Sequence, residues 1–440
     1  MKNQERQKSR LSATICMGLA LFATQFGAGN LIFPPFLGRN SGADWFEGFI
    51  GFFIMDVGLA AAAVFSVVAN RKGNIEGVVG KIGRLPGKIM VTIIILCLGP
   101  AVCIPRTAAT TYEMGIHLLF PNLPLWLFGA IFFGIVLVFV MKPSKVVDIV
   151  GNYLTPILLA TMVLLIVIGI VNPISESEII ASAVPLHDGI LNGYQTLDGI
   201  GGILMTLMLV TAAQSHGFKK QDEIKKMVAG ADIISAVLLA LVYGGLTFLG
   251  STVSAEPEFA GLAQAPLLIA ITNRLLGNFG VVALTIIVLM ACLTTAIGLS
   301  SVAGNYFEEL TDGKLKYKTT VITIIIASYA MSNVGLSTII SLAAPVLTVL
   351  YPPLIVLVVM ALVDKYIKND RIAGFAAYTA LATSLIEATG MFGLDKLIAL
   401  LPLAEYGLGW IVPTLIGGLL GSCFGNKSVH IEMERLDLQE

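Results

Sequence analysis

Residues 18–38 read GLALFATQFGAGNLIFPPFLG, and this stretch decides how the rest of the chain is interpreted. It lies in an apolar segment, 11–38, that is long enough to cross a membrane. Its middle, FGAGN at 26–30, holds two glycines and an asparagine, which are poor helix formers and predict an interrupted helix. Backbone groups released by a break in a membrane are tolerated only where they line a protected polar cavity. The stretch therefore indicates a binding site inside a membrane protein.

Composition supports a membrane protein. Of the 440 residues, 56% are hydrophobic and 12% are charged, whereas soluble domains have roughly 25% charged residues. The mean hydropathy is +0.87. The five cysteines have no CxxC spacing, so neither a disulfide framework nor a zinc site is expected. No HExxH, GxSxG or Walker sequence is present, and we expect neither an enzyme, nor an organic cofactor, nor a nucleic-acid partner.

Apolar stretches of about 20 residues predict twelve transmembrane helices. The predicted spans are 11–38, 46–69, 86–119, 124–141, 148–171, 187–216, 227–250, 279–308, 316–333, 336–363, 371–390 and 407–425. Residues 1–10 are basic and precede an apolar stretch too long for a signal peptide, so we interpret them as a cytoplasmic tail, with a second tail at 426–440.

The charge distribution agrees with this topology. Cytoplasmic loops are rich in lysine and arginine, and with the N-terminus inside, all but four of the 27 such residues fall on the cytoplasmic side or in its tails. The exceptions are Arg39, Arg106, Arg274 and Lys396. We therefore predict a multi-pass protein of the lipid bilayer with both termini in the cytoplasm.

Two blocks of five predicted spans, 11–171 and 187–363, have similar lengths, and two additional helices follow at 371–425. An odd number of spans per block inverts the second block relative to the first, which is a transporter architecture. A second interruption, TLDGIGG at 196–202, lies in the first span of the second block. The alternative for either glycine-rich run is a helix-packing face.

An interrupted helix can bind ions of both signs. Helix N-termini favour anions through free N–H groups, whereas C-terminal carbonyl groups favour cations. Gly27 and Gly29 would let a ligand approach the main chain closely. An amino acid transported together with sodium fits this combination of charges.

Four sequences resemble the branched-chain amino acid:cation symporter family, the bacterial type II carriers of the amino acid–polyamine–organocation superfamily. They are GLALFATQFGAGNLIFPPFLG (18–38), GPAVCIPRTAATTYEMGI (99–116), GYQTLD (193–198) and ACLTTAIGL (291–299). The resemblance implies a leucine-transporter-type fold with helices 1 and 6 broken, in the bacterial cell membrane. It also implies uptake of leucine, isoleucine and valine by sodium symport. The alternatives are proton coupling, or another neutral or aromatic amino acid on the same fold. TAAQSHGF at 211–218 departs from the family pattern, and the oligomeric state is not predicted.

The resemblance also implies a sodium site between helix 1 and helix 8. The residues that match it are Ala23, Phe26, Ala291, Thr294 and Thr295. The last three occur at i, i+3 and i+4, which places them on one face of a helix, and neutral oxygens suit a monovalent ion. The alternative is that both threonine hydroxyls bond to carbonyl groups one turn earlier in their own helix.

The predicted substrate site lies at the two interruptions. N–H groups near Ala28 and Gly29 are the expected carboxylate ligands, and carbonyl groups around position 196 are the expected ammonium ligands. The full set of predicted substrate-binding residues is Gly27, Ala28, Gly29, Asn30, Thr196, Leu197, Asp198 and Gly199. Spans 3, 6 and 8 are expected to provide an apolar pocket.

Charged residues inside apolar spans are costly and therefore suggest a function. Arg106 and Glu113 lie seven residues apart in span 3, which favours either a structural ion pair or a role in gating or substrate contact. Asp198 has two interpretations, a ligand for a cation or a cap for the following half-helix. For Asp56, Asp232 and Glu387, polar packing is favoured over proton coupling.

Overall fold

The computed structural model describes residues 2–70, 75–141, 155–181, 183–218, 220–367, 369–391 and 394–424, and within these ranges the secondary structure is entirely helical. Seven helical segments are long and apolar enough to cross a membrane, and three apolar helices are shorter, at Leu125–Val140, Leu158–Val171 and Ile411–Cys423. An all-helical membrane protein is therefore confirmed. The predicted tail at 426–440 and the start of the predicted span 148–171 lie outside the described residues.

The first part of the chain contains several helices that continue one another through short irregular turns. Its elements are α1 (Lys2–Gln25), α2 (Ala28–Ser41), η1 (Gly42–Asp44), α3 (Trp45–Phe53), η2 (Ile54–Gly58), α4 (Leu59–Ala69), α5 (Glu76–Val79), η3 (Gly80–Ile82), α6 (Arg84–Leu96), η4 (Cys97–Ala101), α7 (Cys103–Thr111), η5 (Tyr112–Ile116), α8 (His117–Leu119), α9 (Leu125–Val140) and α11 (Thr155–Val171). Helix α1 begins at Lys2, so residues assigned to the N-terminal tail extend the first helix.

The second part begins with another pair of adjoining helices. Its elements are α12 (Pro185–Thr196), α13 (Asp198–Ser215), α14 (Gln221–Ser251), η8 (Pro257–Phe259), α15 (Gln264–Leu310), α16 (Tyr317–Ser332), α17 (Leu336–Leu362), α18 (Asp370–Thr389), α19 (Asp395–Ile398), η10 (Ala404–Tyr406) and α20 (Ile411–Cys423). Helix α15 contains a kink at Gly277, whose φ is +57°. This long helix therefore bends near its N-terminal third.

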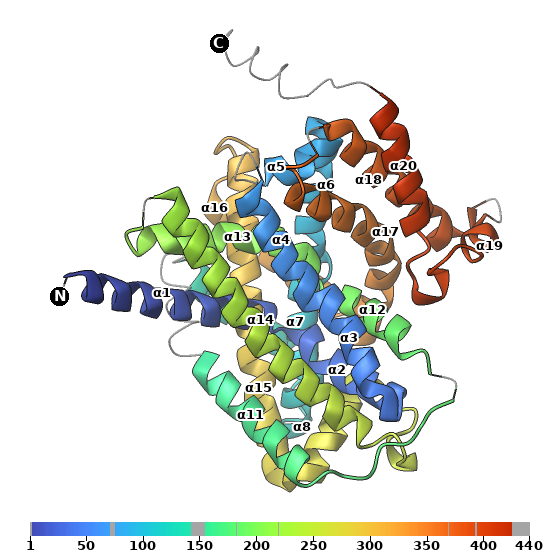
Figure 1. The fold of residues 1–440 in the computed structure, drawn as a ribbon. Coiled ribbons are helices and arrows are strands. Elements are labelled where there is room, and N and C mark those ends of the chain that lie inside the picture. Colours follow the sequence, from blue (N-terminus) through green and yellow to red (C-terminus); the bar gives the residue numbers. More distant parts are fainter. Residues whose placement is uncertain are drawn as a thin grey trace.

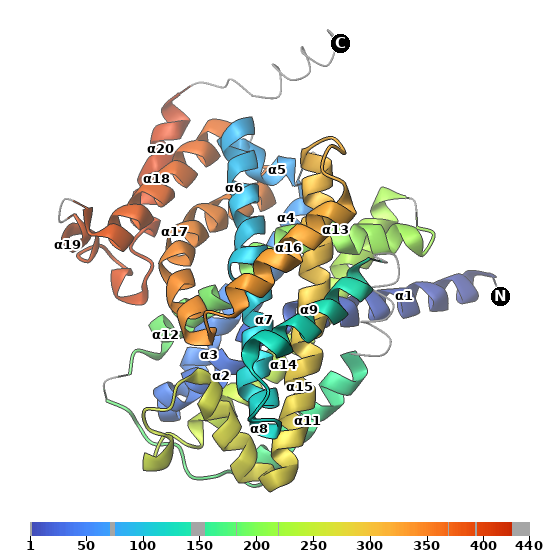
Figure 2. The same cartoon turned by 180° about the vertical axis from the view of Figure 1, so that it is seen from behind.

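The long helix α14 crosses the front of the molecule in the view of Figure 1, and the long helix α15 lies behind it. Helices α18 and α20 pack together at one edge, next to α17 (Figure 1). Seen from behind, α9 and α16 cross in front of α7 and α15 (Figure 2). The adjoining ends of α1 and α2 and those of α12 and α13 are buried, and α2 packs on α12, α14 and α15, whereas the N-terminal part of α1 projects from the other helices (Figure 1).

Glycines allow several of these helices to approach backbone to backbone. A Cβ atom added to Gly38 of α2 would lie 1.8 Å from the Thr247 carbonyl oxygen of α14, and one added to Gly250 would lie 2.0 Å from the Pro35 carbonyl oxygen. A Cβ on Gly189 of α12 would meet the Gly48 carbonyl oxygen of α3 at 2.1 Å. Small residues at such contacts are the usual way in which membrane helices pack, because lipid supplies no hydrophobic driving force between helices.

Candidate substrate and cation site

The first interruption consists of two residues between α1 and α2. Helix α1 ends at Gln25, and Gly27 is extended, with φ −113° and ψ −159°. The Gly27 N–H donates a hydrogen bond to Asn30 Oδ1 (3.2 Å), which satisfies one backbone donor at the start of α2. The carbonyl end of α1 and the N–H end of α2 therefore meet at one point inside the protein.

The second interruption is a single residue, Leu197, between α12 and α13. Its φ of +73° is left-handed, although the side chain is fully buried. This conformation costs a residue other than glycine roughly 1–2 kcal/mol. Backbone strain of this kind persists only where the surrounding packing enforces it, and it is common at functional sites. The TLDGIGG run thus interrupts a helix at Leu197 rather than at one of its glycines.

The predicted sodium ligands from α1 and α15 lie together at the first interruption. Thr294 Oγ1 donates to the carbonyl oxygens of Ala23 and Ala291, both at 2.9 Å. Thr295 Oγ1 lies 3.5 Å from the carbonyl oxygens of both Ala23 and Phe26. The five predicted oxygens therefore form one cluster that bridges two helices. A sixth oxygen not predicted from the sequence, the Thr24 carbonyl, accepts from Thr295 at 3.1 Å.

The alternative interpretation, in which both threonine hydroxyls bond to carbonyl groups of their own helix, holds only in part. Thr294 does bond to a carbonyl group of its own helix, that of Ala291, but it also reaches α1. The hydrogen bonds of the Thr295 hydroxyl within the described residues go to the last turn of α1 and to Phe26, the residue that follows it. Gly27 is required beside it, because an added Cβ would lie 2.9 Å from Thr295 Oγ1. The two threonines are thus directed at the interruption.

A second polar cluster joins the two interruptions. Asn30 Nδ2 donates to Asp198 Oδ2 (2.7 Å) and to the Tyr243 hydroxyl (2.6 Å), and it lies 3.4 Å from Asp56 Oδ2. Thr196 Oγ1 donates to Asp56 Oδ1 (2.8 Å). Both carboxyl groups are almost completely buried, with Asp56 0% and Asp198 6% exposed. Five different helical elements therefore converge on one buried pair of acids.

Two members of this cluster were not recognised in the sequence. Asp56 was interpreted as an isolated acid, but it contacts residues of both interruptions, and Tyr243 was not singled out. A lone carboxylate in an apolar span is functional by default, so FIMDVGL at 53–59 carried the signal for Asp56. For Tyr243 in α14 the sequence has no comparable signal.

Arg106 and Glu113 are not brought together. Arg106 Nη1 donates to the Gln195 carbonyl oxygen (2.6 Å) and Nη2 to that of Thr196 (3.2 Å). Glu113 Oε1 accepts from the backbone N–H of Leu336 (3.1 Å), the first residue of α17. The structural ion pair expected between them is therefore absent from the described part of the chain. Between the two residues, α7 passes into the π-helical segment η5 at Tyr112, so a spacing of seven residues does not correspond to two α-helical turns.

The break in span 3 is a third irregularity. Gly99 has non-helical angles (φ −87°, ψ −119°) and precedes Pro100, and Val102 is also non-helical. Proline removes a backbone donor and hinders the preceding turn, so the sequence GPAVCIP is poorly suited to a straight helix. The break begins a new helix, α7, whose first turns carry Arg106 towards the second interruption.

The expected ammonium ligands are largely occupied. The Thr196 carbonyl oxygen accepts from Arg106, and the Leu197 carbonyl oxygen accepts from the Gly201 N–H at 2.9 Å. Asp198 instead contacts Asn30 with its carboxyl group, and it makes no side-chain hydrogen bond that would cap α13. Of its two interpretations, the geometry favours the one in which the carboxyl group faces the site.

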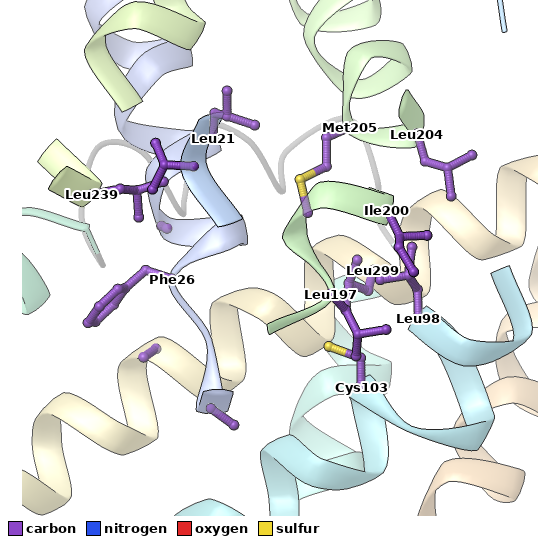
Figure 3. Close-up of a cluster of buried hydrophobic side chains, with 14 of the residues drawn as sticks. Leu21, Phe26, Leu98, Cys103, Leu197, Ile200, Leu204, Met205, Leu239 and Leu299 are labelled. Atoms are coloured by element: carbon purple, nitrogen blue, oxygen red, sulfur yellow. The ribbon is translucent and has the colours of Figure 1, made fainter. Parts of the chain in front are cut away.

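Apolar side chains lie beside the second interruption. Figure 3 shows Leu197 and Ile200 close to Leu98, Cys103 and Leu299, with Phe26 on the opposite side at the first interruption. All of these side chains are buried. Gly99 is also buried, yet a Cβ added to it would meet only Ala303 Cβ, at 4.0 Å. Helices from spans 3, 6 and 8 therefore contribute buried apolar side chains beside the second interruption.

The fold is shared with known transporters. The structure resembles a closed, bromovinylhydantoin-bound transporter of the nucleobase-cation-symport-1 family, with a TM-score of 0.60 and 14% identity, over 92% of this chain and 90% of that chain. It also resembles a sodium-coupled sialic acid symporter, with a TM-score of 0.58 and 13% identity, over 94% and 90% of the two chains. These similarities show that the chain has the leucine-transporter-type fold of these two proteins.

Sequence comparison assigns the family. The family described as "Branched-chain amino acid transport protein" matches residues 10–428. The branched-chain amino acid permease BraB of Bacillus subtilis is 33% identical over 93% of this chain and 94% of its own length. The permease BrnQ of Salmonella typhimurium is 34% identical over 91% and 93%. The chain belongs to this family of transport proteins, which are not enzymes, as the sequence predicted.

Proposed function

We propose that this protein imports leucine, isoleucine and valine across the bacterial cytoplasmic membrane by symport with sodium. Family membership and the names of the related permeases support the substrate class. The observation that carries the coupling is the cluster of neutral oxygens in which Thr294 and Thr295 of α15 meet the carbonyl end of α1. Neutral oxygens from the main chain and from hydroxyl groups suit a hard monovalent cation.

The substrate is bound between the two interruptions. The N–H end of α2 at Ala28 and Gly29 attracts the carboxylate. The ammonium group lies on the side of Asp198 and Asp56, whose buried carboxyl groups attract a cation more strongly than a neutral carbonyl oxygen does. The aliphatic side chain packs against the buried apolar residues Leu98, Ile200 and Leu299. Branched aliphatic groups are preferred there because burial of apolar surface favours them by about 0.8 kcal/mol per CH₂.

The buried charges also favour a coupled cation. Arg106 supplies one positive charge near the site, whereas Asp56 and Asp198 supply two carboxyl groups. An amino acid zwitterion adds no net charge, so it does not compensate the remaining carboxylate. Uncompensated charge in a membrane interior is costly, and a sodium ion or a proton removes that cost. Proton coupling through the carboxyl pair is the second candidate.

The proposed architecture has twelve membrane crossings, arranged as two inverted repeats at 11–171 and 187–363 followed by two helices at 371–425. Alternating access then follows from movement of α1–α2 and α12–α13, since each is divided at the site. No oligomeric state is proposed.

Uptake by purified protein in liposomes tests the function. Labelled leucine should accumulate under an imposed sodium gradient at constant pH, and unlabelled isoleucine or valine should compete. Accumulation driven only by a proton gradient would reject sodium coupling and support the carboxyl pair as the coupling site. If leucine, isoleucine and valine all fail to exchange across active vesicles, the substrate assignment is wrong.

A further inference from the structure

Arg106 is fully buried between the two interruptions. It lies in the first turns of α7, just after the break at Gly99–Val102, and Figure 3 shows that Cys103 of the same turn lies near Leu197. Its side chain is 1% exposed. Nη1 and Nη2 donate to the last two carbonyl groups of α12, those of Gln195 and Thr196. These bonds fix the guanidinium group at the negative end of α12.

The same guanidinium group lies against the start of α2. A Cβ added to Gly29 would be 2.8 Å from Arg106 Nη2 and 3.2 Å from Cζ. The Phe33 ring, one turn further along α2, lies 5.9 Å from Cζ. Arg106 therefore adds a full positive charge beside the N–H end of α2, where the helix already attracts anions.

One donor of this arginine has no partner. Arg106 Nε is buried and makes no hydrogen bond within the described residues, and no carboxylate there lies within ion-pair distance of the guanidinium group. Buried donors are nearly always paired, and an unpaired donor on a charged group is particularly costly. The unpaired donor therefore indicates that a ligand completes this site. The guanidinium edge offers parallel N–H groups, which match a carboxylate.

We propose that Arg106 binds the α-carboxylate of the transported amino acid, together with the first N–H groups of α2. The inference rests on the proposed amino acid transport. It identifies Arg106 as the residue that distinguishes an amino acid with a free carboxylate from its amide. Gln195 and Thr196 position the guanidinium group through their carbonyl oxygens, so substrate binding couples α7, α2 and α12. Glycine at position 29 is then required by the arginine as well as by the substrate.

The test compares the binding of amino acids with the binding of their amides to purified full-length protein. Binding is measured by titration calorimetry with sodium present for L-leucine and L-leucinamide, and for the same pairs of valine and phenylalanine. Wild type should bind the acids at least about tenfold more tightly than the amides, because the amide cannot form the charge-assisted pair. Arg106→Gln should weaken acid binding by roughly 10- to 150-fold, the range for hydrogen bonds to charged groups. Amide binding should change much less, so the ratio of the two affinities should fall.

Arg106→Lys keeps the positive charge but not the planar guanidinium edge. Its preference for acids over amides should therefore be greater than that of Arg106→Gln but smaller than that of wild type. Glu113→Gln is the matched control on the same span, because Glu113 contacts the start of α17 instead of the site. It should leave the acid-to-amide ratio unchanged. Thermal unfolding in detergent and its sodium dependence establish that each variant is folded.

Three results would overturn the inference. The first is folded Arg106→Gln with wild-type leucine affinity. The second is an equal loss of acid and amide binding in that variant, because this would show that Arg106 only braces α12. The third is a wild type that does not distinguish acids from amides. Wild type that binds phenylalanine but no branched-chain amino acid would reject the proposed substrate while leaving the acid-to-amide test of Arg106 valid. Binding of none of the acids would reject both.

Discussion

Thr294 and Thr295 direct their hydroxyl groups at carbonyl oxygens of α1, and a bound cation would use the same oxygens. Thr294→Val and Thr295→Val keep the branched shape while removing one oxygen each. If these oxygens bind sodium, each variant should need more sodium for half-maximal leucine binding. Leucine affinity should recover at least in part at high sodium, because coupling between two ligands is reciprocal. Titrations of leucine binding against sodium measure this effect.

The two threonine variants also distinguish a purely structural role of the hydroxyl groups from a role in cation binding. Removal of either hydroxyl leaves a buried carbonyl group of α1 with one donor fewer, which costs about 1–3 kcal/mol if nothing replaces it. A purely structural role would therefore lower thermal stability without changing the sodium dependence. Sodium curves that overlay the wild-type curve in both variants would remove Thr294 and Thr295 from the cation site.

Gly29 provides a second prediction about a single residue. Gly29→Leu should abolish leucine binding, because even its Cβ atom would lie 2.8 Å from Arg106 Nη2 and would displace the guanidinium group. Gly134→Leu is the control, since an added Cβ there would have no neighbour within 4 Å. Calorimetry on folded protein measures both. Near-normal leucine affinity in Gly29→Leu would mean that FGAGN is only a packing face.

Local spacing predicted some residues of the site and not others. The i, i+3, i+4 spacing of Ala291, Thr294 and Thr295 places them on one helical face in any straight helix, so their shared direction was predictable. Asp56 and Asn30 are 26 positions apart and meet only through tertiary packing. The pairing of Arg106 with Glu113 was wrong, because the rule of two turns along one face requires a regular α-helix between the two residues, and the π-helical segment η5 begins at Tyr112.

At the scale of helices, the packing of α14 requires glycine at position 250 but not at position 244. A Cβ on Gly250 would lie 2.0 Å from the Pro35 carbonyl oxygen of α2, so Gly250→Ala requires the backbones to separate. We expect a loss of about 1–3 kcal/mol, typical of overpacking, and a lower melting temperature. Because α2 carries the first interruption, leucine affinity should fall as well. Thermal unfolding monitored by size-exclusion chromatography measures the stability.

Gly244→Ala is the matched control in the same helix. Its added Cβ would lie 3.5 Å from Phe49, which is an ordinary contact, and alanine is the better helix former. Its melting temperature should equal or exceed that of wild type. Equal losses in the two variants would contradict the view that the contact between α2 and α14 is specifically close.

Helix positions were more predictable from the sequence than helix continuity. Runs of apolar residues predicted where α14 and α17 lie to within a few residues, because the hydrocarbon core requires a minimum length of apolar helix. The extension of the eighth span back to Gln264 was not predicted, since Asn273, Arg274 and the kinked Gly277 interrupt the apolar run of the sequence there. The left-handed Leu197 was not predictable either, because packing rather than residue preference imposes that conformation.

For the whole molecule, the inverted-repeat proposal requires an odd number of membrane crossings in each of the two blocks, 11–171 and 187–363. Positively charged loops set the orientation of membrane helices, and the distribution of lysine and arginine predicts that both termini lie in the cytoplasm. Three highly exposed residues are suitable reporters of this topology. Ile179 is 80%, Tyr366 82% and Leu400 81% exposed, so a cysteine at each would be equally accessible to a thiol reagent in the absence of a membrane.

Cysteine mapping therefore tests the topology directly. In a variant whose five native cysteines are replaced by alanine or serine, Ile179→Cys and Leu400→Cys should react with a membrane-impermeant maleimide in intact cells. Tyr366→Cys should react only after permeabilisation, because the predicted spans 187–216, 227–250, 279–308, 316–333 and 336–363 separate it from position 179. One further span, 371–390, separates it from position 400. Labelling of Tyr366→Cys in intact cells would require an even number of crossings in the second block. The second block would then differ from the first in its number of crossings and could not be its inverted repeat, which would remove the basis of the proposed alternating-access architecture.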